Sequence, residues 1–191
     1  MVQVELLQDA ASSSRYIPLV EVKVGDRILS VNNQGQQVFS PVVYLPHARN
    51  HEHTTYVVLT TESGRDVKMT RSHYLPAGAC SSPFTLPIIV ASQVMVGDCV
   101  QTLSGREQIV SVGETEGKGI YTVIAMEELI VVNGIVATPY GGVNPTVANI
   151  YYNMHRLAYA TFFQSSSALS TMMQVQGFTE KIWGVLSGLS L

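Results

Sequence analysis

The chain has 191 residues, of which 46% are hydrophobic and 13% are charged, and its formal net charge is -3. This length suits one sizeable domain or one domain with an appendage, and the low share of charged residues indicates a large interior. A slightly acidic chain without a basic run does not favour nucleic acid as a partner. Residues 1–20 contain Glu5 and Asp9 and lack the apolar run of a secretory signal peptide.

Two stretches of the sequence resemble each other. The stretch "VKVGDRILSVNNQGQQVFSPVV" begins at Val22, and "VMVGDCVQTLSGREQIVSVG" begins at Val94. Each contains Val-Gly-Asp, a short apolar alternation, a turn with glycine and a second β-rich run. Gly25 of the first Val-Gly-Asp lies 72 residues before Gly97 of the second. Internal repeats mark duplicated architectures, so we expect two similar β units, although valine-rich hairpins can also resemble each other by chance.

The repeat continues beyond these first segments. Val38 and Ile109 align at a separation of 71 residues. The later segments "TYVVLTTESGRDVKMTRSHYLPAG" and "IYTVIAMEELIVVNGIVATPYGG" align at a separation of 65 residues, which sets His73 opposite Thr138. Two blocks that keep their order at nearly constant separation favour a duplication with pseudo-two-fold symmetry.

Strand-forming residues fill the chain from Val2 to Ala137. Valine, isoleucine, threonine and tyrosine dominate this part, and it has no helical period. Turn-forming pairs punctuate it at Asn32-Asn33, Ser63-Gly64, Ser104-Gly105 and Asn133-Gly134. We therefore predict an all-β domain over residues 1–143 that is built from many short strands.

The hydrophobic period changes after Asn144-Pro145, which suit the N-cap and first residue of a helix. We expect residues 144–191 to form an apolar helical tail, with a helix over 145–163. One face of that helix should dock on the β domain through Ile150, Tyr151, Met154 and Leu157. No charge occurs over 157–179, so contact with a lipid or membrane surface is the alternative, whereas scattered polar residues make a spanning helix a poor fit.

Three stretches together carry a family resemblance. The stretch "MTRSHYL" places Thr70 and His73 three residues apart after a strand-like run. It follows "ELLQDAASSSRYIPLVEVKVGDRILSVNNQGQQVFS" and precedes "LIVVNGIVATPYG". In this order the stretches resemble the Hint module, which is shared by inteins and the C-terminal autoprocessing domain of Hedgehog proteins. The Hedgehog-type branch is the closer match, and the likeness covers about Val4 to Ala160.

The resemblance implies the Hint fold and a self-cleaving chemistry. In such domains a cysteine at the first position attacks the preceding carbonyl and forms a thioester, and a second nucleophile then takes the acyl group. In Hedgehog proteins that nucleophile is the hydroxyl of cholesterol. The resemblance makes His73 the proton donor to the departing amine and Thr70 the group that holds the scissile peptide. The structural alternative for His73 is a buried histidine satisfied by a backbone carbonyl.

The sequence departs from the Hedgehog pattern at three places. The chain begins "MVQVELL", so the nucleophilic cysteine would stand a few residues upstream of Val4 in a longer precursor, or self-cleavage has been lost. The closing Ser-Cys-Tyr is replaced by Thr138-Pro139-Tyr140, in which proline removes a thiol and a backbone donor. The aspartate that activates the sterol hydroxyl corresponds to His47, which would activate a sterol, another alcohol or water, unless it is an ordinary loop histidine.

The remaining cysteines and histidines give weaker signals. Cys80 and Cys99 allow at most one disulfide, and we expect both to be small apolar fillers rather than nucleophiles. His47, His51 and His53 fall within seven residues, which suits zinc, but a fourth ligand is not evident. We therefore expect no metal or other cofactor, and keep a zinc-binding β module as a minor alternative.

The sequence thus predicts a domain that cleaves the peptide bond before its own N-terminus, with Thr70, His73 and His47 as its catalytic residues. The alternative is a degenerate, non-catalytic Hint module that serves as an interaction or lipid-binding domain. The expected partners are the domain's own N-terminal cargo, a sterol or lipid acceptor and, through the tail, a membrane surface. The resemblance implies the secretory pathway or the extracellular space.

Overall fold

The computed structural model describes residues 2–7, 13–83 and 85–162. The chain divides into two compact units, Met1–Gly142 and Val143–Leu191. The first unit is a β domain with two short 3-10 helices, η1 (Leu19–Glu21) and η2 (Ala91–Gln93). Its strands in chain order are β1 (Gln3–Leu7), β2 (Ser14–Pro18), β3 (Arg27–Val31), β4 (Gln37–Thr61), β5 (Asp66–Thr70), β6 (Tyr74–Gly78), β7 (Ile88–Val90), β8 (Cys99–Thr102), β9 (Gly105–Ala125), β10 (Leu129–Val132) and β11 (Ile135–Ala137).

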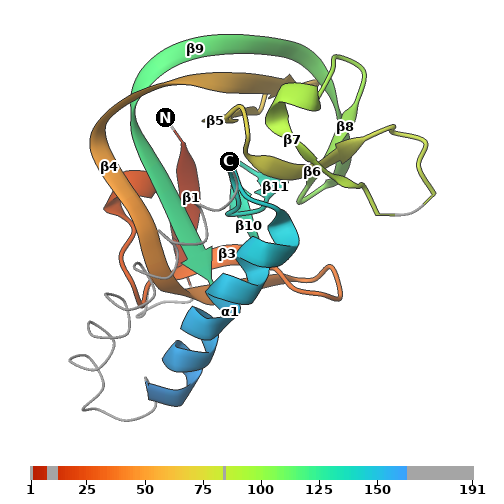
Figure 1. Ribbon diagram of the computed structural model, residues 1–191. Coiled ribbons are helices and arrows are strands. Elements are labelled where there is room, and N and C mark those ends of the chain that lie inside the picture. Colours follow the sequence, from red (N-terminus) through yellow and green to blue (C-terminus); the bar gives the residue numbers. More distant parts are fainter. Residues whose placement is uncertain (1, 8–12, 84, 163–191) are drawn as a thin grey trace. The chain divides into compact units, whose positions relative to one another are not determined.

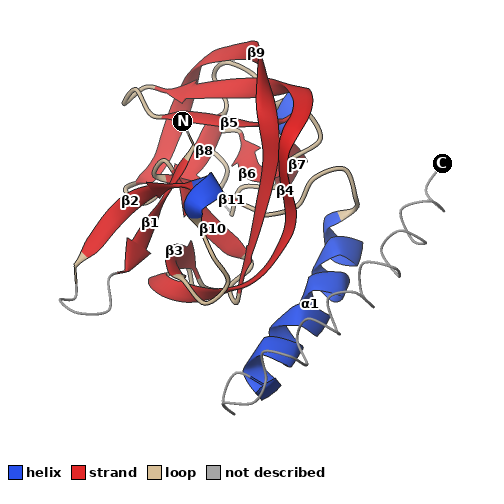
Figure 2. Ribbon diagram, turned by 90° about the vertical axis from the view of Figure 1, so that its left-hand side faces the viewer, coloured by secondary structure: helices blue, strands red, loops and turns tan. Residues whose placement is uncertain are grey.

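Two long strands connect the two halves of the β domain. The strands follow the order β11-β10-β1-β3-β4-β9-β8-β6-β7, with β2 paired to β1 and β5 paired to β4. β4 and β9 pair antiparallel from Val42–Ala125 to Thr61–Ile109, with several register shifts. Figures 1 and 2 show them as two curved arms that run side by side. The predicted all-β architecture is confirmed.

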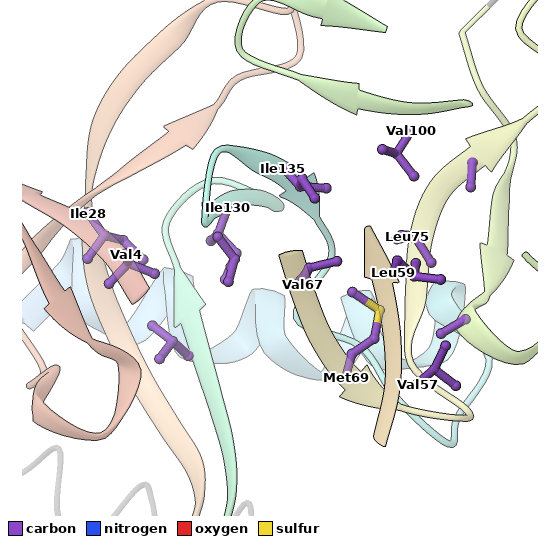
Figure 3. Packing of buried hydrophobic residues seen from close by; sticks show 14 of the residues in the cluster. Val4, Ile28, Val57, Leu59, Val67, Met69, Leu75, Val100, Ile130 and Ile135 are labelled. Carbon is purple, nitrogen blue, oxygen red and sulfur yellow. The ribbon is translucent and has the colours of Figure 1, made fainter. Parts of the chain in front are cut away.

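The core explains why these residues form strands. Hydrophobic side chains alternate with polar ones in strands such as β5, and the inward side chains meet in one large cluster (Figure 3). Its fully buried members include Val4, Ile28, Leu59, Leu75 and Ile135. Burying such a side chain contributes roughly 1.5–3 kcal/mol, so this cluster is a main source of the domain's stability. A second, smaller cluster contains Leu29, Val131 and Val136.

The duplication is visible in matching backbone hydrogen bonds. The Gly25 N–H donates to the carbonyl of Val42 at 2.8 Å, and the Gly97 N–H donates to the carbonyl of Ile109 at 2.9 Å. Both glycines have a positive φ, 96° and 98°, which the turn requires and glycine adopts without strain. The next residue, Asp26 in the first repeat, accepts from a backbone N–H three positions earlier, as its counterpart does in the second repeat.

The repeat begins earlier than the sequence pattern indicates. β1 pairs with β2 in the same register as β6 pairs with β7. The Leu19 N–H donates to the Val2 carbonyl at 3.0 Å, and the Ala91 N–H donates to the His73 carbonyl at 2.7 Å. Val2 and His73 are therefore equivalent positions, and the start of the second repeat is the histidine of the Thr-x-x-His motif.

One predicted alignment between the two repeats is wrong. We aligned Val38 with Ile109, but the hydrogen bonds make Val42 the counterpart of Ile109. The two hairpins differ in length, because residues 32–36 connect β3 to β4 whereas residues 103–104 connect β8 to β9. The sequence separation between equivalent residues of the two repeats therefore changes after this hairpin turn.

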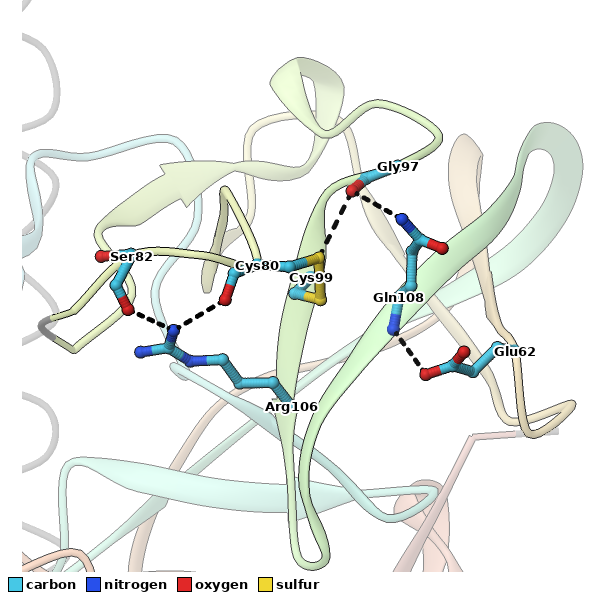
Figure 4. The surroundings of a disulfide bond; sticks show 7 residues. All are labelled: Glu62, Cys80, Ser82, Gly97, Cys99, Arg106 and Gln108. Atoms are coloured by element: carbon cyan, nitrogen blue, oxygen red, sulfur yellow. Dashed lines mark hydrogen bonds between the residues drawn. A yellow bond between two sulfur atoms is a disulfide. The ribbon is translucent and has the colours of Figure 1, made fainter.

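The two cysteines are joined, which corrects their interpretation as apolar fillers. Cys80 and Cys99 form a disulfide with a Cα–Cα distance of 4.9 Å (Figure 4). The bond ties the loop after β6 to the first residue of β8. The Arg106 guanidinium donates to the carbonyls of Cys80, at 3.1 Å, and Ser82, at 2.5 Å, so the same loop is also held by hydrogen bonds.

The second unit contains helix α1 (Pro145–Phe162). The predicted N-cap is confirmed, because the Asn144 side-chain oxygen accepts from the Thr146 N–H at 2.9 Å. The predicted segment after Ser165 lies outside the described residues. Within the described residues, no helix has both the length and the apolar character needed to cross a membrane.

The predicted buried face of α1 is wrong at three of its four residues. Tyr151 is buried, whereas three residues are exposed by 64%, 44% and 69% of their surface: Ile150, Met154 and Leu157. The buried residues of α1 are instead Ala148, Tyr151, Tyr152, His155 and Arg156. The ring of Tyr151 lies 5.1 Å from that of Tyr152 and 5.2 Å from that of His155. The buried residues include His155 and Arg156, so a search for an apolar stripe did not select them.

Reduction of the Cys80–Cys99 bond should destabilise the β domain by about 3 kcal/mol, the value that chain entropy gives for a loop of similar size. The bond spans a sequence separation of 19. Urea unfolding with and without a phosphine reductant measures the effect. The Cys80→Ser/Cys99→Ser variant is the control and should show the lowered midpoint under both conditions. Equal midpoints for the oxidised and reduced chain would contradict the expectation.

Candidate functional site

Thr70 and His73 lie at the two ends of one tight turn. Thr70 is the last residue of β5, and His73 immediately precedes β6. The His73 N–H donates to the Thr70 carbonyl at 3.0 Å, which closes the four-residue turn. The three-residue spacing in the sequence therefore places both side chains at one corner between two strands.

The end of the second repeat runs antiparallel to this turn. His73 forms an isolated β-bridge with Gly141. The Tyr74 N–H donates to the Tyr140 carbonyl at 2.9 Å, and the Gly142 N–H donates to the Ser72 carbonyl at 3.1 Å. The segment 138–142 thus forms one wall of the candidate site.

The His73 ring contacts this wall through one nitrogen. Its Nε2 lies 2.7 Å from the Thr138 carbonyl oxygen, so the predicted proximity of His73 and Thr138 is confirmed. A carbonyl can only accept a hydrogen bond, so Nε2 must carry a proton here. In the neutral imidazole Nδ1 then holds the lone pair, and it is the nitrogen available for chemistry.

Nδ1 of His73 and the hydroxyl of Thr70 both lie beside Gly141. A Cβ atom at Gly141 would lie 3.4 Å from Nδ1 and 3.7 Å from the Thr70 Oγ1. Gly141 is exposed, and Thr70 and His73 are partly exposed. A peptide arriving from solvent could therefore meet a proton acceptor and a hydroxyl at the same place. Sequence reasoning did not identify Gly141, although "PYGG" offered the signal.

Burial decides the protonation of His73. Burial of the ring lowers the pKa of His73 below its ordinary value of 6.5, and the hydrogen bond with Thr138 partly offsets this effect. Arg71, the charged side chain within the turn, forms an ion pair with Glu114 on β9. His73 is therefore neutral at pH 7, which leaves the Nδ1 lone pair free to accept a proton.

The turn is supported from behind by η2. The Ala91 N–H donates to the His73 carbonyl at 2.7 Å, and the Ser92 N–H donates to the Arg71 carbonyl at 3.0 Å. Both bonds start at the first turn of η2, which lies in the loop closed by the disulfide. The backbone of the Thr70–His73 turn is thus held on two sides.

The beginning of the chain reaches the other end of β5. The Gln3 N–H donates to the Asn133 side-chain oxygen at 2.8 Å, and the Asn133 amide donates to the Asp66 carbonyl at 2.6 Å. β5 runs from Asp66 to Thr70, a length of about 13 Å. A few residues upstream of Val2 would have the reach to extend from there to the turn.

No contact of the described residues joins a histidine of β4 to the Thr70–His73 turn. The backbone of His47 pairs with Thr122, whereas Thr70 pairs with Tyr56, nine residues further along β4. The side chain of His47 lies outside what the structure describes, so its assigned role stays a prediction. His51 and His53 are exposed, and the described residues contain no group of three or more metal-ligating side chains.

The family model and the similar sequences of known proteins point to the same family. The family model of the Hint module matches residues 10–180. Protein hedgehog of Drosophila sechellia is 32% identical over 133 residues, which cover 66% of this chain and 28% of that protein. Warthog protein 6 of Caenorhabditis elegans is 20% identical over 166 residues, which cover 84% of this chain and 27% of that protein. The chain therefore spans little more than a quarter of these relatives.

Solved structures give the same fold. An intein from a hyperthermophile superposes with a TM-score of 0.60 at 11% identity, covering 72% of this chain and 95% of that chain. A DnaB intein from Synechocystis gives a TM-score of 0.55 at 15% identity, covering 75% of this chain and 100% of that chain. The chain belongs to the Hint module family, has the intein-like Hint fold and is related to the C-terminal domains of hedgehog, Warthog and qua-1 proteins.

Proposed function

We propose that this chain is the self-processing domain of a longer precursor. It cleaves the peptide bond before its own N-terminus by an N-to-S acyl shift, and it passes the acyl group to a sterol, another alcohol or water. The observation that supports this most is that His73 Nδ1 and the Thr70 hydroxyl converge beside the exposed Gly141. The relationship to inteins and to hedgehog proteins supports the same reaction class.

The first step needs a base. A cysteine upstream of Val4 gives its thiol proton to the neutral Nδ1 of His73, and the thiolate attacks the carbonyl carbon of the preceding residue. The carbonyl π electrons move to the oxygen of a tetrahedral intermediate. The Thr70 hydroxyl orients the scissile peptide for this attack, which contributes by positioning rather than by proton transfer.

The second step needs an acid, and the same residue supplies it. The protonated imidazole now carries the thiol proton on Nδ1. As the tetrahedral intermediate collapses and the C–N bond breaks, His73 donates this proton to the departing nitrogen. The products are a thioester to the upstream segment and a free α-amine on the cysteine. His73 returns to the neutral form, so it acts first as base and then as acid.

The acceptor step and the cellular setting belong to the same proposal. His47 would accept the proton of the attacking hydroxyl, and the tail beyond α1 would present a sterol or lipid. The N-terminal cargo of the precursor is the covalent partner. The Cys80–Cys99 disulfide supports a location in the secretory pathway or outside the cell, because disulfides persist in oxidising compartments.

Replacing His73 should disable the acyl shift. In a precursor that carries a cargo and a cysteine at the junction, His73→Ala should slow thioester formation by about 10²–10⁴-fold, the usual contribution of general acid–base help. Trapping with hydroxylamine, which leaves the disulfide intact, followed by intact-mass analysis measures the rate. His53→Ala, at an exposed position on β4, is the matched control and should react normally.

Two results would go against this assignment. A His73→Ala precursor that reacts at the unmutated rate would make His73 a structural histidine. A folded precursor with intact His73 and the cysteine in place that forms no thioester would favour the non-catalytic Hint module instead.

Stability should respond to the lowered pKa of His73. The unfolded chain binds a proton near pH 6.5 and the folded chain does so at lower pH, so the free energy of unfolding falls as pH drops below about 6.5. His73→Gln removes this titration. Urea unfolding from pH 7.5 to 5 should show a steeper loss for the unmodified chain than for the variant. Parallel curves would mean that His73 has an ordinary pKa.

The tail should matter for the acceptor and not for the acyl shift. Deletion of residues 165–191 should leave the β domain folded and thioester formation unchanged, because the site lies wholly within residues 2–142. It should abolish transfer to a lipid acceptor, measured by mass spectrometry with detergent-dispersed sterol. A truncated chain that unfolds would make the tail part of the fold, and normal sterol transfer would remove the tail from the reaction.

A further inference from the structure

We propose that Thr138 is a positioning residue whose hydroxyl holds its own backbone carbonyl against Nε2 of His73. This contact fixes the proton on Nε2 and leaves Nδ1 as the reactive nitrogen. The part of the proposal that concerns the tautomer stands on geometry alone. The part that concerns rate rests on the proposed self-processing function.

The hydroxyl of Thr138 makes two hydrogen bonds. Its Oγ1 donates to the Tyr74 carbonyl at 2.7 Å and accepts from the Tyr140 N–H at 3.2 Å. Thr138 is buried, with 2% of its surface exposed. One side chain thus links the first residue of β6 to the wall formed by residues 138–142.

These contacts surround the carbonyl that faces His73. Tyr74 directly follows His73, and its N–H also donates to the Tyr140 carbonyl at 2.9 Å. The Thr138 hydroxyl and the Tyr140 carbonyl therefore hold the wall to β6 on both sides of the Thr138 carbonyl. The Thr138 carbonyl oxygen lies 2.7 Å from Nε2 of His73, in the segment that these two hydrogen bonds hold against β6.

Pro139 makes the hydroxyl more important. Proline has no N–H, so residue 139 cannot donate a backbone hydrogen bond to β6. Proline also restricts the preceding residue to extended conformations, which suits Thr138 in this segment. The wall is therefore secured at this point by the side chain of Thr138 and the backbone of Tyr140.

The tautomer decides whether the ring can act as a base. A neutral imidazole carries one N–H, and the acceptor carbonyl at Nε2 places it there. Nδ1 then presents its lone pair to the space shared with Thr70 Oγ1. If the carbonyl moved away, the proton could reside on Nδ1, and the ring would present a donor where the thiol requires an acceptor.

Few other groups near His73 influence which ring nitrogen carries the proton. The influences on the pKa of His73 are burial, which is the larger, and the hydrogen bond to Thr138. Arg71 in the turn is paired with Glu114 on β9, and η2 faces the turn with backbone N–H groups at Ala91 and Ser92. A change in the tautomer of His73 would therefore report on the Thr138 contact.

The test compares Thr138→Val, which keeps the shape and removes the hydroxyl, with Thr138→Ser, which keeps the hydroxyl. In the full chain, the ¹⁵N shifts of His73 should show a protonated Nε2 and a bare Nδ1 in the unmodified protein and in Thr138→Ser. In Thr138→Val both shifts should move toward each other as the two tautomers mix. In the cysteine-bearing precursor, Thr138→Val should slow thioester formation by about 10²-fold, the cost of misplacing a reacting group, and Thr138→Ser should restore it.

The outcomes separate this proposal from the proposed function. Unmodified protein with the proton on Nδ1, or Thr138→Val with unchanged shifts, would overturn the positioning role. Shifts that behave as expected in a precursor that never forms a thioester would uphold the positioning role and reject the self-processing function. If Thr138→Val does not fold, Thr138→Ala provides the same comparison, and the tautomer of the unmodified protein still decides the central point.

Discussion

The antiparallel contact between residues 72–74 and 138–142 is the constraint on which the rest of the site depends. It joins the start of the second repeat to its end, so it can form only when that repeat is folded. The contact places a backbone carbonyl on one nitrogen of His73 and leaves the other nitrogen beside the exposed Gly141. A backbone contact between residues 65 positions apart thereby determines which nitrogen of His73 carries the proton.

The surrounding elements restrict movement at this contact. β4 and β9 carry the pairing between the repeats, and η2 bonds the backbone of the Thr70–His73 turn from the other side. The disulfide closes the loop that contains η2 and fastens it to the start of β8. The proposed reaction brings a thiol, a peptide carbonyl and an imidazole together, and it would benefit from such rigidity because small misplacements cost large factors in rate.

Sequence patterns predicted the parts of this structure that depend on local chemistry. The Val-Gly-Asp turns, the strand content and the N-cap at Asn144 follow from local residue preferences. The predicted proximity of His73 to Thr138 is confirmed, although the residue equivalent to His73 in the first repeat is Val2. The alignment of Val38 with Ile109 was wrong because the two hairpins differ in length, which changes the sequence separation between equivalent residues. The disulfide was missed because it depends on which segments of the β domain meet in three dimensions. The buried residues of α1 were missed because they include His155 and Arg156 and not only apolar side chains. Gly141 was missed because its contribution is the absence of a side chain. The role of His47 stays a prediction.

The measurement that tests the account most directly is the intact mass of the full-length protein recovered from its native host. Self-processing through His73 predicts two polypeptides, cut at one bond before a cysteine that precedes Val4, with the upstream segment ending in a carboxylate or an ester. A single uncut polypeptide whose Hint domain is folded would contradict the account, because the carbonyl-bound His73 would then serve structure alone.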